Sequence, residues 1–271
     1  MNIKPLLDWM IERQRIYRRR QRGDPPPWTD DPVMRKFHFC NVFRSLDRTT
    51  AWLVENWYLP NAMRTSLPFA CYLARYGFSV PTLDEIGFPR RWDPARVLRV
   101  LRARRAPARR ETICTGAFQV WPGLQRRPFE EHAVEILSAV HAARRSWSWQ
   151  PTLREMCAEL TKIRGVGRFT SYQAALDMQL SGWFRPADVD SWCSVQAGSL
   201  AGLRMVCPED VTASGVAKIR DEARRALAHK DIMFRGLAMH DVEHSLCELY
   251  KYSRGGAGRR YRPNSESRRI A

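Results

Sequence analysis

Apolar residues recur along most of the chain at intervals of three and four positions, the spacing that places them on one side of a helix. No convincing stretch alternates apolar and polar residues as a half-buried strand would, and no internal repeat is evident. One long helix is expected from about residue 29 to residue 57, because Thr29-Asp30-Asp31-Pro32 offers capping side chains and a proline in the first turn. Other helices are expected over residues 95–105, 112–120, 129–143, 153–162, 169–180, 211–228 and 236–252. The pattern predicts an all-α protein.

The regions outside these helices divide the chain. Residues 1–27 combine a short amphipathic start with a run of arginines and three consecutive prolines, and they are expected to form a basic N-terminal arm. Residues 28–252 are expected to form the helical domain, with short helices and loops where Pro and Gly punctuate residues 60–94. Residues 253–271 are rich in Gly and Arg and are expected to be a disordered basic tail.

The charge of the chain indicates a polyanionic partner. The net charge is +17, and only six of the 45 basic residues are lysine, which leaves 39 arginines. A solvated arginine-rich surface accounts for part of this bias, but the excess over 28 acidic residues favours nucleic acid. Arg18–Arg22 and Arg259–Arg269 are interpreted as flexible arms on DNA, and Arg96–Arg110 as a contact to the DNA backbone.

The cysteines lie far apart, without a C-x-x-C pair or a zinc spacing, so they are interpreted as reduced, mostly buried thiols and no metal site is predicted. No signal peptide or membrane span is expected, because the first 22 residues are too charged and too interrupted. A cytoplasmic protein is expected, in the host cytoplasm if the chain is viral. The seven positions are Cys40, Cys71, Cys114, Cys157, Cys193, Cys207 and Cys247.

A pair of glycines separates two of the expected helices. Gly165 and Gly167 let the backbone turn sharply and bring its N–H groups, at the positive end of the following helix, close to a DNA phosphate. Lys162, Arg164 and Arg168 flank the turn and add sequence-independent attraction. Its carbonyls are also suited to a monovalent cation, and an ordinary helix–helix turn is the alternative.

This stretch resembles the helix-hairpin-helix DNA glycosylase superfamily, whose hairpin is followed by an aspartate in a Val-Asp context. Val189-Asp190 follows Gly165 at that spacing. The resemblance implies a hairpin at about residues 153–180, two helical lobes with a cleft, and Asp190 as the essential carboxylate. Asp190 as a helix N-cap is the alternative, with Asp188 a rival carboxylate. Phe169 stands where bifunctional glycosylases place a lysine, which argues against Schiff-base chemistry.

The last expected helix carries two contrasting faces. Its polar side is a candidate catalytic or pyrophosphate-binding set, with Asp241 and His244 as catalytic candidates and Lys251 as an anion contact. His240 and His244 also have the spacing of metal ligands, and a plain solvated face is the alternative. The apolar side holds Met239, Val242, Leu246, Leu249 and Tyr250, and the polar side holds His240, Asp241, His244, Glu248 and Lys251.

A second polar group lies on the long helix expected near the N-terminus. Arg44 and Arg48 are one turn apart, where two guanidinium groups can grip phosphate oxygens, and Asp47 lies beside them. The alternative is a side of the helix that simply faces water.

Three segments together, residues 27–48, 160–190 and 239–254, resemble a narrower, phage-associated family. It comprises the α-glutamyl/putrescinyl thymine pyrophosphorylases, or amino acid:DNA transferases, and the helical domain attached to hydroxymethyluracil DNA kinases. The resemblance spans about residues 25–262 and implies double-stranded DNA in which the thymine methyl carries a pyrophosphate. An amine then displaces the pyrophosphate. The loop at residues 196–203 lacks the Gly-Pro-Gly turn of many relatives.

The resemblance implies roles for the candidate residues. Asp190 is the first candidate for the general base that deprotonates the amine, and His244 is the second. Arg44, Arg48 and Lys251 are candidates for neutralising the leaving group. No redox cofactor is required, although a divalent metal on the pyrophosphate remains open.

The remaining choices concern the donor and the reaction. An amino acid, glycine first, is favoured over putrescine as the amine, because arginines are in excess. The chain has no G-x-x-x-x-G-K-[ST] sequence, so it is interpreted as the transferase, acting after a DNA kinase of the same pathway. A monofunctional DNA glycosylase and a non-catalytic DNA-binding accessory protein are the alternatives.

Overall fold

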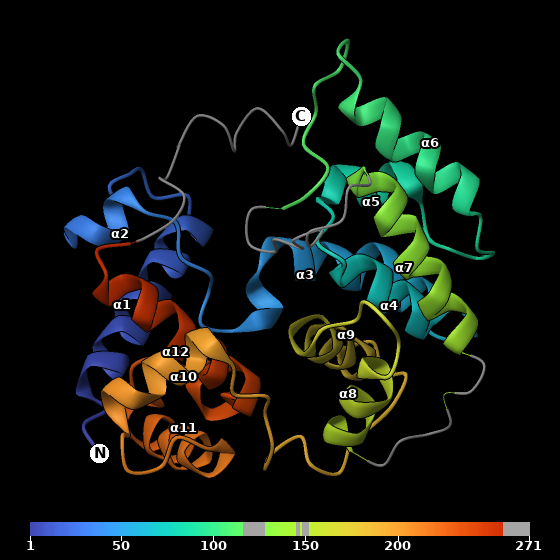
Figure 1. Ribbon diagram of the computed structural model, residues 1–271. Coiled ribbons are helices and arrows are strands. Elements are labelled where there is room, and N and C mark those ends of the chain that lie inside the picture. Colours follow the sequence, from blue (N-terminus) through green and yellow to red (C-terminus); the bar gives the residue numbers. More distant parts are fainter. Residues whose placement is uncertain (116–127, 145–146, 148–151, 257–271) are drawn as a thin grey trace. The chain divides into compact units, whose positions relative to one another are not determined.

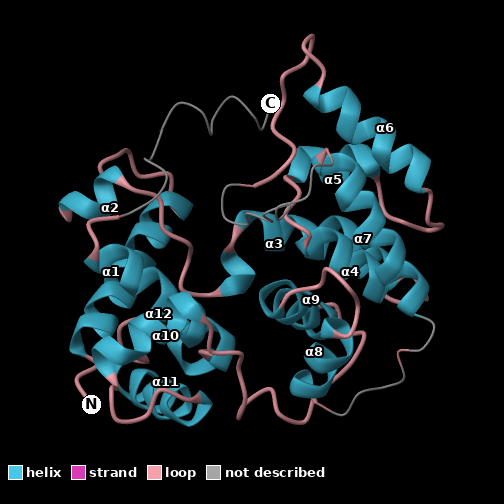
Figure 2. Cartoon of the chain, in the orientation of Figure 1, coloured by secondary structure: helices cyan, strands magenta, loops and turns pink. Residues whose placement is uncertain are grey.

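The computed structural model describes residues 1–115, 128–144, 147 and 152–256, and these are folded as helices joined by turns and loops (Figures 1 and 2). The all-α prediction is confirmed: the described residues contain no strand, and their β-type pairing is limited to isolated bridges such as the one between Phe78 and Cys114. None of the described helices is both long and apolar enough to cross a bilayer. The chain forms two compact units, a first unit of residues 1–47 and 190–271 and a second unit of residues 48–189.

The second unit is built around a buried helix. α9 (Arg168–Leu180) packs against α4 (Leu67–Arg75) and α8 (Leu153–Thr161), and α4 also packs against α7 (Phe129–Ala143). The remaining elements are α3 (Arg48–Leu53), η2 (Val54–Tyr58), η3 (Leu59–Asn61), α5 (Val80–Ile86) and α6 (Pro94–Arg105).

A buried ion pair joins the central elements of the second unit. Arg75 on α4 donates through Nε to Asp177 Oδ2 on α9 at 2.5 Å, and both side chains are buried. The Tyr58 hydroxyl donates to the same oxygen at 2.5 Å. Because a buried carboxylate without partners costs several kcal/mol (about 3–5), this triad holds α4, α9 and η2 in one arrangement.

The first unit is built from both ends of the chain. Its core helix α12 (Met239–Ser253) packs against α10 (Ala197–Val206), α11 (Ala213–Leu227) and α1 (Lys4–Gln21). The short elements of this unit are α2 (Pro32–Lys36), η1 (Arg44–Leu46) and η5 (Ile232–Gly236).

Two glycines on α10 explain how closely it approaches α12. A Cβ added to Gly202 would lie 2.0 Å from the Leu246 carbonyl oxygen, and one added to Gly198 would lie 2.4 Å from Cys247 Sγ. The sequence pattern gave no helix here, because Gly disfavours a helix interior. Close contact between the two backbones outweighs that preference.

Six of the expected helices are confirmed within about two residues at most ends: α6, α7, α8, α9, α11 and α12. The helix expected over residues 112–120 is wrong for the part that the structure describes. Residues 112–115 are not helical, and Cys114 forms the bridge to Phe78. Residues 116–120 lie outside the described residues.

The long helix expected over residues 29–57 is also wrong. Asp31 caps α2 by accepting from Val33 N at 2.9 Å and Met34 N at 2.8 Å, as the sequence indicated. α2 nevertheless ends at Lys36, and Phe37 has extended backbone angles of −118° and 151°. The chain then runs without an α-helix to η1, so the wheel of residues 29–57 does not describe it.

The basic N-terminal arm is a packed helix. α1 buries apolar residues such as Leu6 and Trp9, and it also buries Arg13. Arg18, expected to be part of a flexible arm, donates to both carboxylate oxygens of Asp231, at 2.7 and 2.8 Å. Charge alone suggested an arm, but these internal acceptors fix the helix on the first unit. The basic tail of residues 257–271 lies outside the described residues.

We predict that Gly202→Ala destabilises the protein, because the new Cβ would overlap the Leu246 carbonyl. Overpacking of this kind costs about 1–3 kcal/mol, and overlap with backbone favours the upper end. Urea unfolding followed by circular dichroism measures the change. Gly236→Ala is the matched control, since a Cβ there would meet nothing within 4 Å. Equal stability of the two variants would contradict the close contact between α10 and α12.

Candidate functional site

Residues 37–47 cross the first unit beside α12, and side chains from other helices satisfy their backbone groups. Arg13 of α1 donates through Nε to the carbonyls of Phe39 at 3.2 Å and Cys40 at 2.9 Å. Its Nη2 donates to Asn41 Oδ1 at 2.5 Å. Buried backbone groups must find partners, and these partners replace the helical hydrogen bonds that the sequence pattern predicted. We call residues 37–47 the crossing segment.

Two buried carboxylates of α12 fix the crossing segment from the other side. Glu248 Oε2 accepts from Cys40 N at 3.0 Å, and Asp241 Oδ1 accepts from Arg44 N at 2.9 Å. Asp241 Oδ2 also accepts from Ala238 N at the start of α12, at 3.0 Å. The polar side of α12 is therefore largely buried against the crossing segment and is not a plain solvated face.

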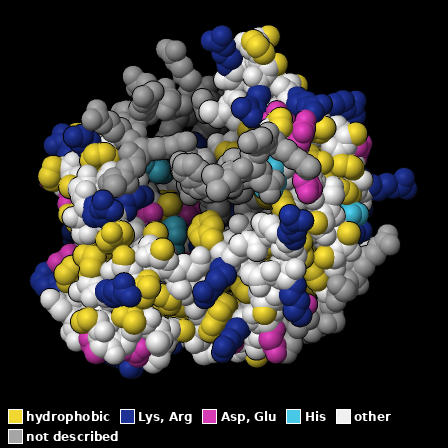
Figure 3. All heavy atoms as spheres, in the orientation of Figure 1, with side chains coloured by type: hydrophobic (Ala, Val, Ile, Leu, Met, Phe, Trp, Pro, Cys, Tyr) yellow, Lys and Arg dark blue, Asp and Glu magenta, His cyan; other side chains and the backbone are white. Residues whose placement is uncertain are grey.

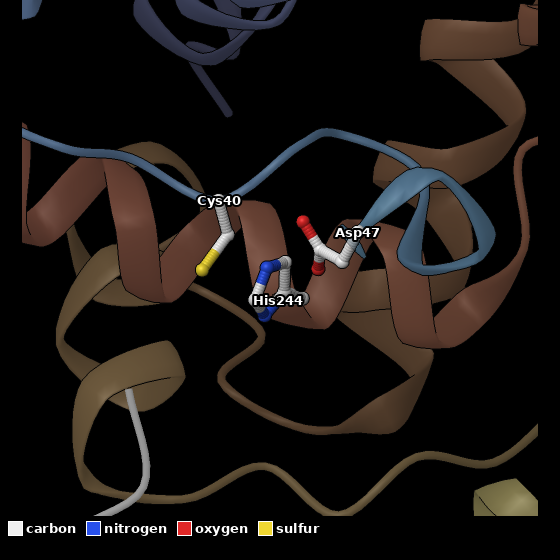
Figure 4. Close-up of side chains that lie close together, drawn as sticks. All are labelled: Cys40, Asp47 and His244. Atoms are coloured by element: carbon white, nitrogen blue, oxygen red, sulfur yellow. The ribbon is translucent and has the colours of Figure 1, made fainter. Parts of the chain in front are cut away.

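This packing brings three potential ligands together. One ligand atom each from Cys40, Asp47 and His244 lies within 4.8 Å of the other two, and all three side chains are half-buried. Cys40 and Asp47 project from the crossing segment toward His244 on α12 (Figure 4). We call these residues the Cys–Asp–His cluster. Helical spacing suggested His240 and His244 as a pair of metal ligands. The structure instead groups His244 with Cys40 and Asp47.

Both acidic and basic groups lie around Cys40: the carboxylates of Glu248 and Asp47, and the cations of Lys251 and Arg13. Burial raises the pKa of the Cys40 thiol well above its usual value, and the carboxylates of Glu248 and Asp47 raise it further. Burial also raises the pKa of Glu243. For Glu248 burial acts in the same direction, but the Lys251 ammonium, the His244 ring and the hydrogen bonds from Lys251 and Cys40 N together outweigh it, and the pKa of that carboxyl is lowered. Cys40 is thus a protonated thiol beside at least one ionised carboxylate.

The candidate phosphate-binding residues are divided by the fold. Lys251 lies 2.6 Å from Glu248 and 4.8 Å from the centre of the Phe39 ring. Arg44 is only 9% exposed. It lies in the crossing segment, where its backbone N–H donates to Asp241. Arg48 is exposed and begins α3, so it belongs to the second unit. Arg44 and Arg48 do not share a helix, and the two-arginine grip that the sequence suggested is absent from both units as they are described.

Asp190 lies in the loop before α10, with its side chain 72% exposed. Its Oδ1 is 3.5 Å from Arg220 Nη1 and 3.9 Å from Arg224 Nη2, both on α11. No helix begins directly after it, so the helix N-cap alternative is wrong. Asp188 instead supports the start of α8, whose N-cap is Thr152: its carboxylate accepts from Leu153 N at 2.6 Å and Arg154 N at 3.2 Å.

The two glycines between α8 and α9 have different physical roles. Gly165 has a positive φ of 90°, and an added Cβ would lie 2.1 Å from Ile136 Cδ1, so the fold itself requires glycine there. Gly167 precedes α9 with φ of −85° and would meet nothing within 4 Å if it carried a Cβ. Lys162, Arg164 and Arg168 beside the turn are exposed, and Lys162 also pairs with Glu159.

Many of the basic side chains on α6 and just after it form ion pairs with acidic residues of the same chain. Surface ion pairs contribute little stability, but they reduce the charge available to DNA. On the face drawn in Figure 3, Lys and Arg side chains are spread over the described surface and do not gather in one patch. The pairs are Arg102–Glu131, Arg104–Glu85, Arg105–Glu130 and Arg109–Glu111.

The sequence did not single out Cys40, Arg13 or Glu243. Cys40 was one of seven scattered cysteines, and Arg13 was one of many arginines in a basic run. More than 200 residues separate Cys40 from His244, so no local spacing relates them. A hint was available in the first segment of the family resemblance, which contains Cys40, Arg44 and Asp47 together.

Comparison with known proteins places the chain in a family. The model of the family described as 5-hmdU DNA kinase, helical domain, matches residues 2–259. A 5-hmdU DNA kinase of Bacillus phage SP10 is 27% identical over 275 residues, which cover 91% of this chain and 40% of that protein. No solved structure matches the chain. With nearly its whole length matched, the chain belongs to the family of helical domains found in 5-hmdU DNA kinases.

Proposed function

We propose that this protein is a DNA-modifying transferase that replaces the pyrophosphate of 5-(pyrophosphoryloxymethyl)uracil in DNA with an amine. The observation that carries the proposal is the family match, whose described members act on a 5-substituted uracil in DNA. The matched region covers only 40% of the phage kinase, and the chain contains no phosphate-binding G-x-x-x-x-G-K-[ST] sequence. The sequence resemblance to amino acid:DNA transferases supports the transfer reaction.

The reaction forms a C–N bond at the carbon on position 5 of the base and breaks the C–O bond to pyrophosphate. The amine loses a proton to a general base, and the pyrophosphate leaves with the bonding electrons. Asp190 fits the base because its carboxylate is exposed and is held by cations at 3.5 and 3.9 Å. His244 is the second candidate, and Asp241 acts by holding Arg44 N in the crossing segment.

Basic groups are needed where the leaving group develops charge. Arg44 and Lys251 belong to the first unit, close to the Cys–Asp–His cluster, and Arg220 and Arg224 lie beside Asp190. An amino acid is the favoured donor, glycine first, because such cations also suit a donor carboxylate. Putrescine would need acidic groups in their place.

The turn between α8 and α9 fits a contact to the DNA backbone in the manner of a helix-hairpin-helix. Gly167 has room for a side chain in the folded protein, so its glycine is not explained by internal packing. Close approach of a phosphate to the N–H groups at the start of α9 supplies the reason. Lys162, Arg164 and Arg168 would add charge around that phosphate.

We predict that Asp190→Asn lowers the transfer rate by about 10²- to 10⁴-fold, the usual contribution of a general base. DNA containing 5-(pyrophosphoryloxymethyl)uracil is incubated with glycine, glutamate or putrescine and digested for nucleoside mass spectrometry. A nucleoside with the mass of one amine adduct identifies the reaction and its donor. Asp221→Asn is the matched control, because Asp221 is also exposed and pairs with Arg220 but is not a candidate base.

Other outcomes of that experiment decide between functions. Release of a free base would replace the transferase with a monofunctional glycosylase. Unchanged DNA with all three amines, together with tight DNA binding that Asp190→Asn leaves intact, would replace it with a DNA-binding accessory protein. A steep dependence of binding on salt is expected for all three and separates none of them.

We predict that Gly167→Ala weakens DNA binding by about tenfold, equivalent to about 1.4 kcal/mol, while changing the free energy of unfolding little. The added methyl group has room in the protein but would push a phosphate away from the turn. Fluorescence anisotropy with a duplex oligonucleotide measures the affinity. Gly165→Ala should instead destabilise the fold, because it introduces strain at φ 90° and overlap with Ile136. Unchanged DNA affinity in Gly167→Ala would remove the turn from the DNA interface.

A further inference from the structure

We propose that Cys40, Asp47 and His244 form a binding site for a divalent transition-metal ion, with Zn²⁺ as the preferred ion. The three residues come from the crossing segment and from α12, and their ligand atoms lie within 4.8 Å of one another. Sulfur, nitrogen and carboxylate oxygen are the three kinds of ligand that Zn²⁺ takes in proteins. The sequence predicted no metal site, since no local spacing connects the three residues.

The distances suit a small ion after a modest adjustment. With metal–ligand bonds of about 2.0–2.3 Å and tetrahedral angles, ligand atoms lie about 3.5 Å apart. Side-chain rotations that move these atoms by about 1 Å close the site around an ion. The view in Figure 4 shows Cys40 and Asp47 on neighbouring stretches of the crossing segment, facing His244.

The carboxylates at the cluster favour a cation, while the Lys251 ammonium, 2.6 Å from Glu248, and the Arg13 guanidinium act against it. Asp47 contributes a carboxylate directly, and Glu248 accepts from the backbone N–H of Cys40 itself, at 3.0 Å. A bound cation keeps a coordinating thiol deprotonated. The positive charge of the ion would therefore stabilise a Cys40 thiolate beside these carboxylates.

The protein also holds the ligands in place. Asn41 N donates to Asp47 Oδ1 at 3.0 Å, which orients that carboxylate, and Asn41 is itself held by Arg13 at 2.5 Å. His244 Nε2 is buried and has no hydrogen-bond partner among the described residues. A buried ring nitrogen without a partner is costly, and coordination of a metal ion would use the lone pair of that nitrogen.

Three protein ligands leave a coordination position for water or a substrate oxygen, as in catalytic zinc sites. If the proposed transferase function holds, that position fits an oxygen of the pyrophosphate leaving group. His244 then holds the ion, and Asp190 is left as the general base. The metal site itself does not depend on this assignment.

Co²⁺ binding to the untagged full-length chain tests the site without DNA or an amine. We expect a near-ultraviolet sulfur-to-Co²⁺ charge-transfer band that saturates at one ion per chain and disappears when Zn²⁺ is added. Cys40→Ser should abolish the band. His244→Ala should weaken Co²⁺ binding by at least about tenfold, since even residues that only orient a ligand contribute about 10- to 100-fold.

Two further variants keep the test decisive. Cys247→Ser is the matched control, because this half-buried cysteine shares α12 with His244 and should leave the band unchanged. Asp47→Asn keeps an oxygen for the Asn41 N–H and keeps the thiol, so it should retain the band but bind Co²⁺ more weakly. This variant replaces Cys40→Ser if circular dichroism shows that the latter is unfolded.

No band in the wild-type chain, or a band that persists in folded Cys40→Ser, would overturn the proposal. Unchanged affinity in both His244→Ala and Asp47→Asn would do the same. Because the measurement uses the metal alone, a chain that binds Co²⁺ but transfers no amine contradicts only the proposed function. A chain that transfers an amine but binds no Co²⁺ contradicts only the metal site.

Discussion

The buried carboxylates Asp241 and Glu248 are the constraint on which the first unit's candidate site depends. They accept from the backbone N–H groups of Arg44 and Cys40 and so attach the crossing segment to α12. A buried acceptor of this kind is worth more than an exposed one, because breaking it leaves an ionic group without water. With the segment attached at residues 40 and 44, and with Asn41 N donating to Asp47 Oδ1, the side chains of Cys40 and Asp47 are held beside α12.

The consequence is a polar site made from residues that are distant in the sequence. The crossing segment contributes Cys40 and Asp47, and α12 contributes His244. Arg13 of α1 donates to the backbone carbonyls of Phe39 and Cys40 and so holds the crossing segment in place. The close approach of α10, permitted by Gly202, covers another side of α12. A helix whose polar residues are buried in this way needs an interior partner for each of them, and the crossing segment supplies several.

The second unit is held together by a different interaction. Its central ion pair, Arg75 with Asp177, fixes the core around α9, while the turn before α9 stays exposed with its basic side chains. The family match spans both units, from residue 2 to residue 259. The proposed reaction on DNA would use the exposed turn of the second unit, proposed to contact phosphate, and the polar cluster of the first unit, proposed to bind a metal ion.

The sequence by itself determined the all-α class and most of the regular helices, because amphipathic spacing and caps such as Asp31, Asp93 and Thr152 act within a few residues. It also marked Asp241, His244 and the glycine turn as candidate site residues, and their roles stay predictions. Only the tertiary structure decided that the crossing segment is not an α-helix, that residues 197–206 form α10, and that Arg13 and Arg18 pair with groups inside the first unit. Those outcomes depend on partners more than 20 residues away, such as Cys40 for Arg13 and Leu246 for Gly202. The sequence pattern near a residue cannot predict such distant partners.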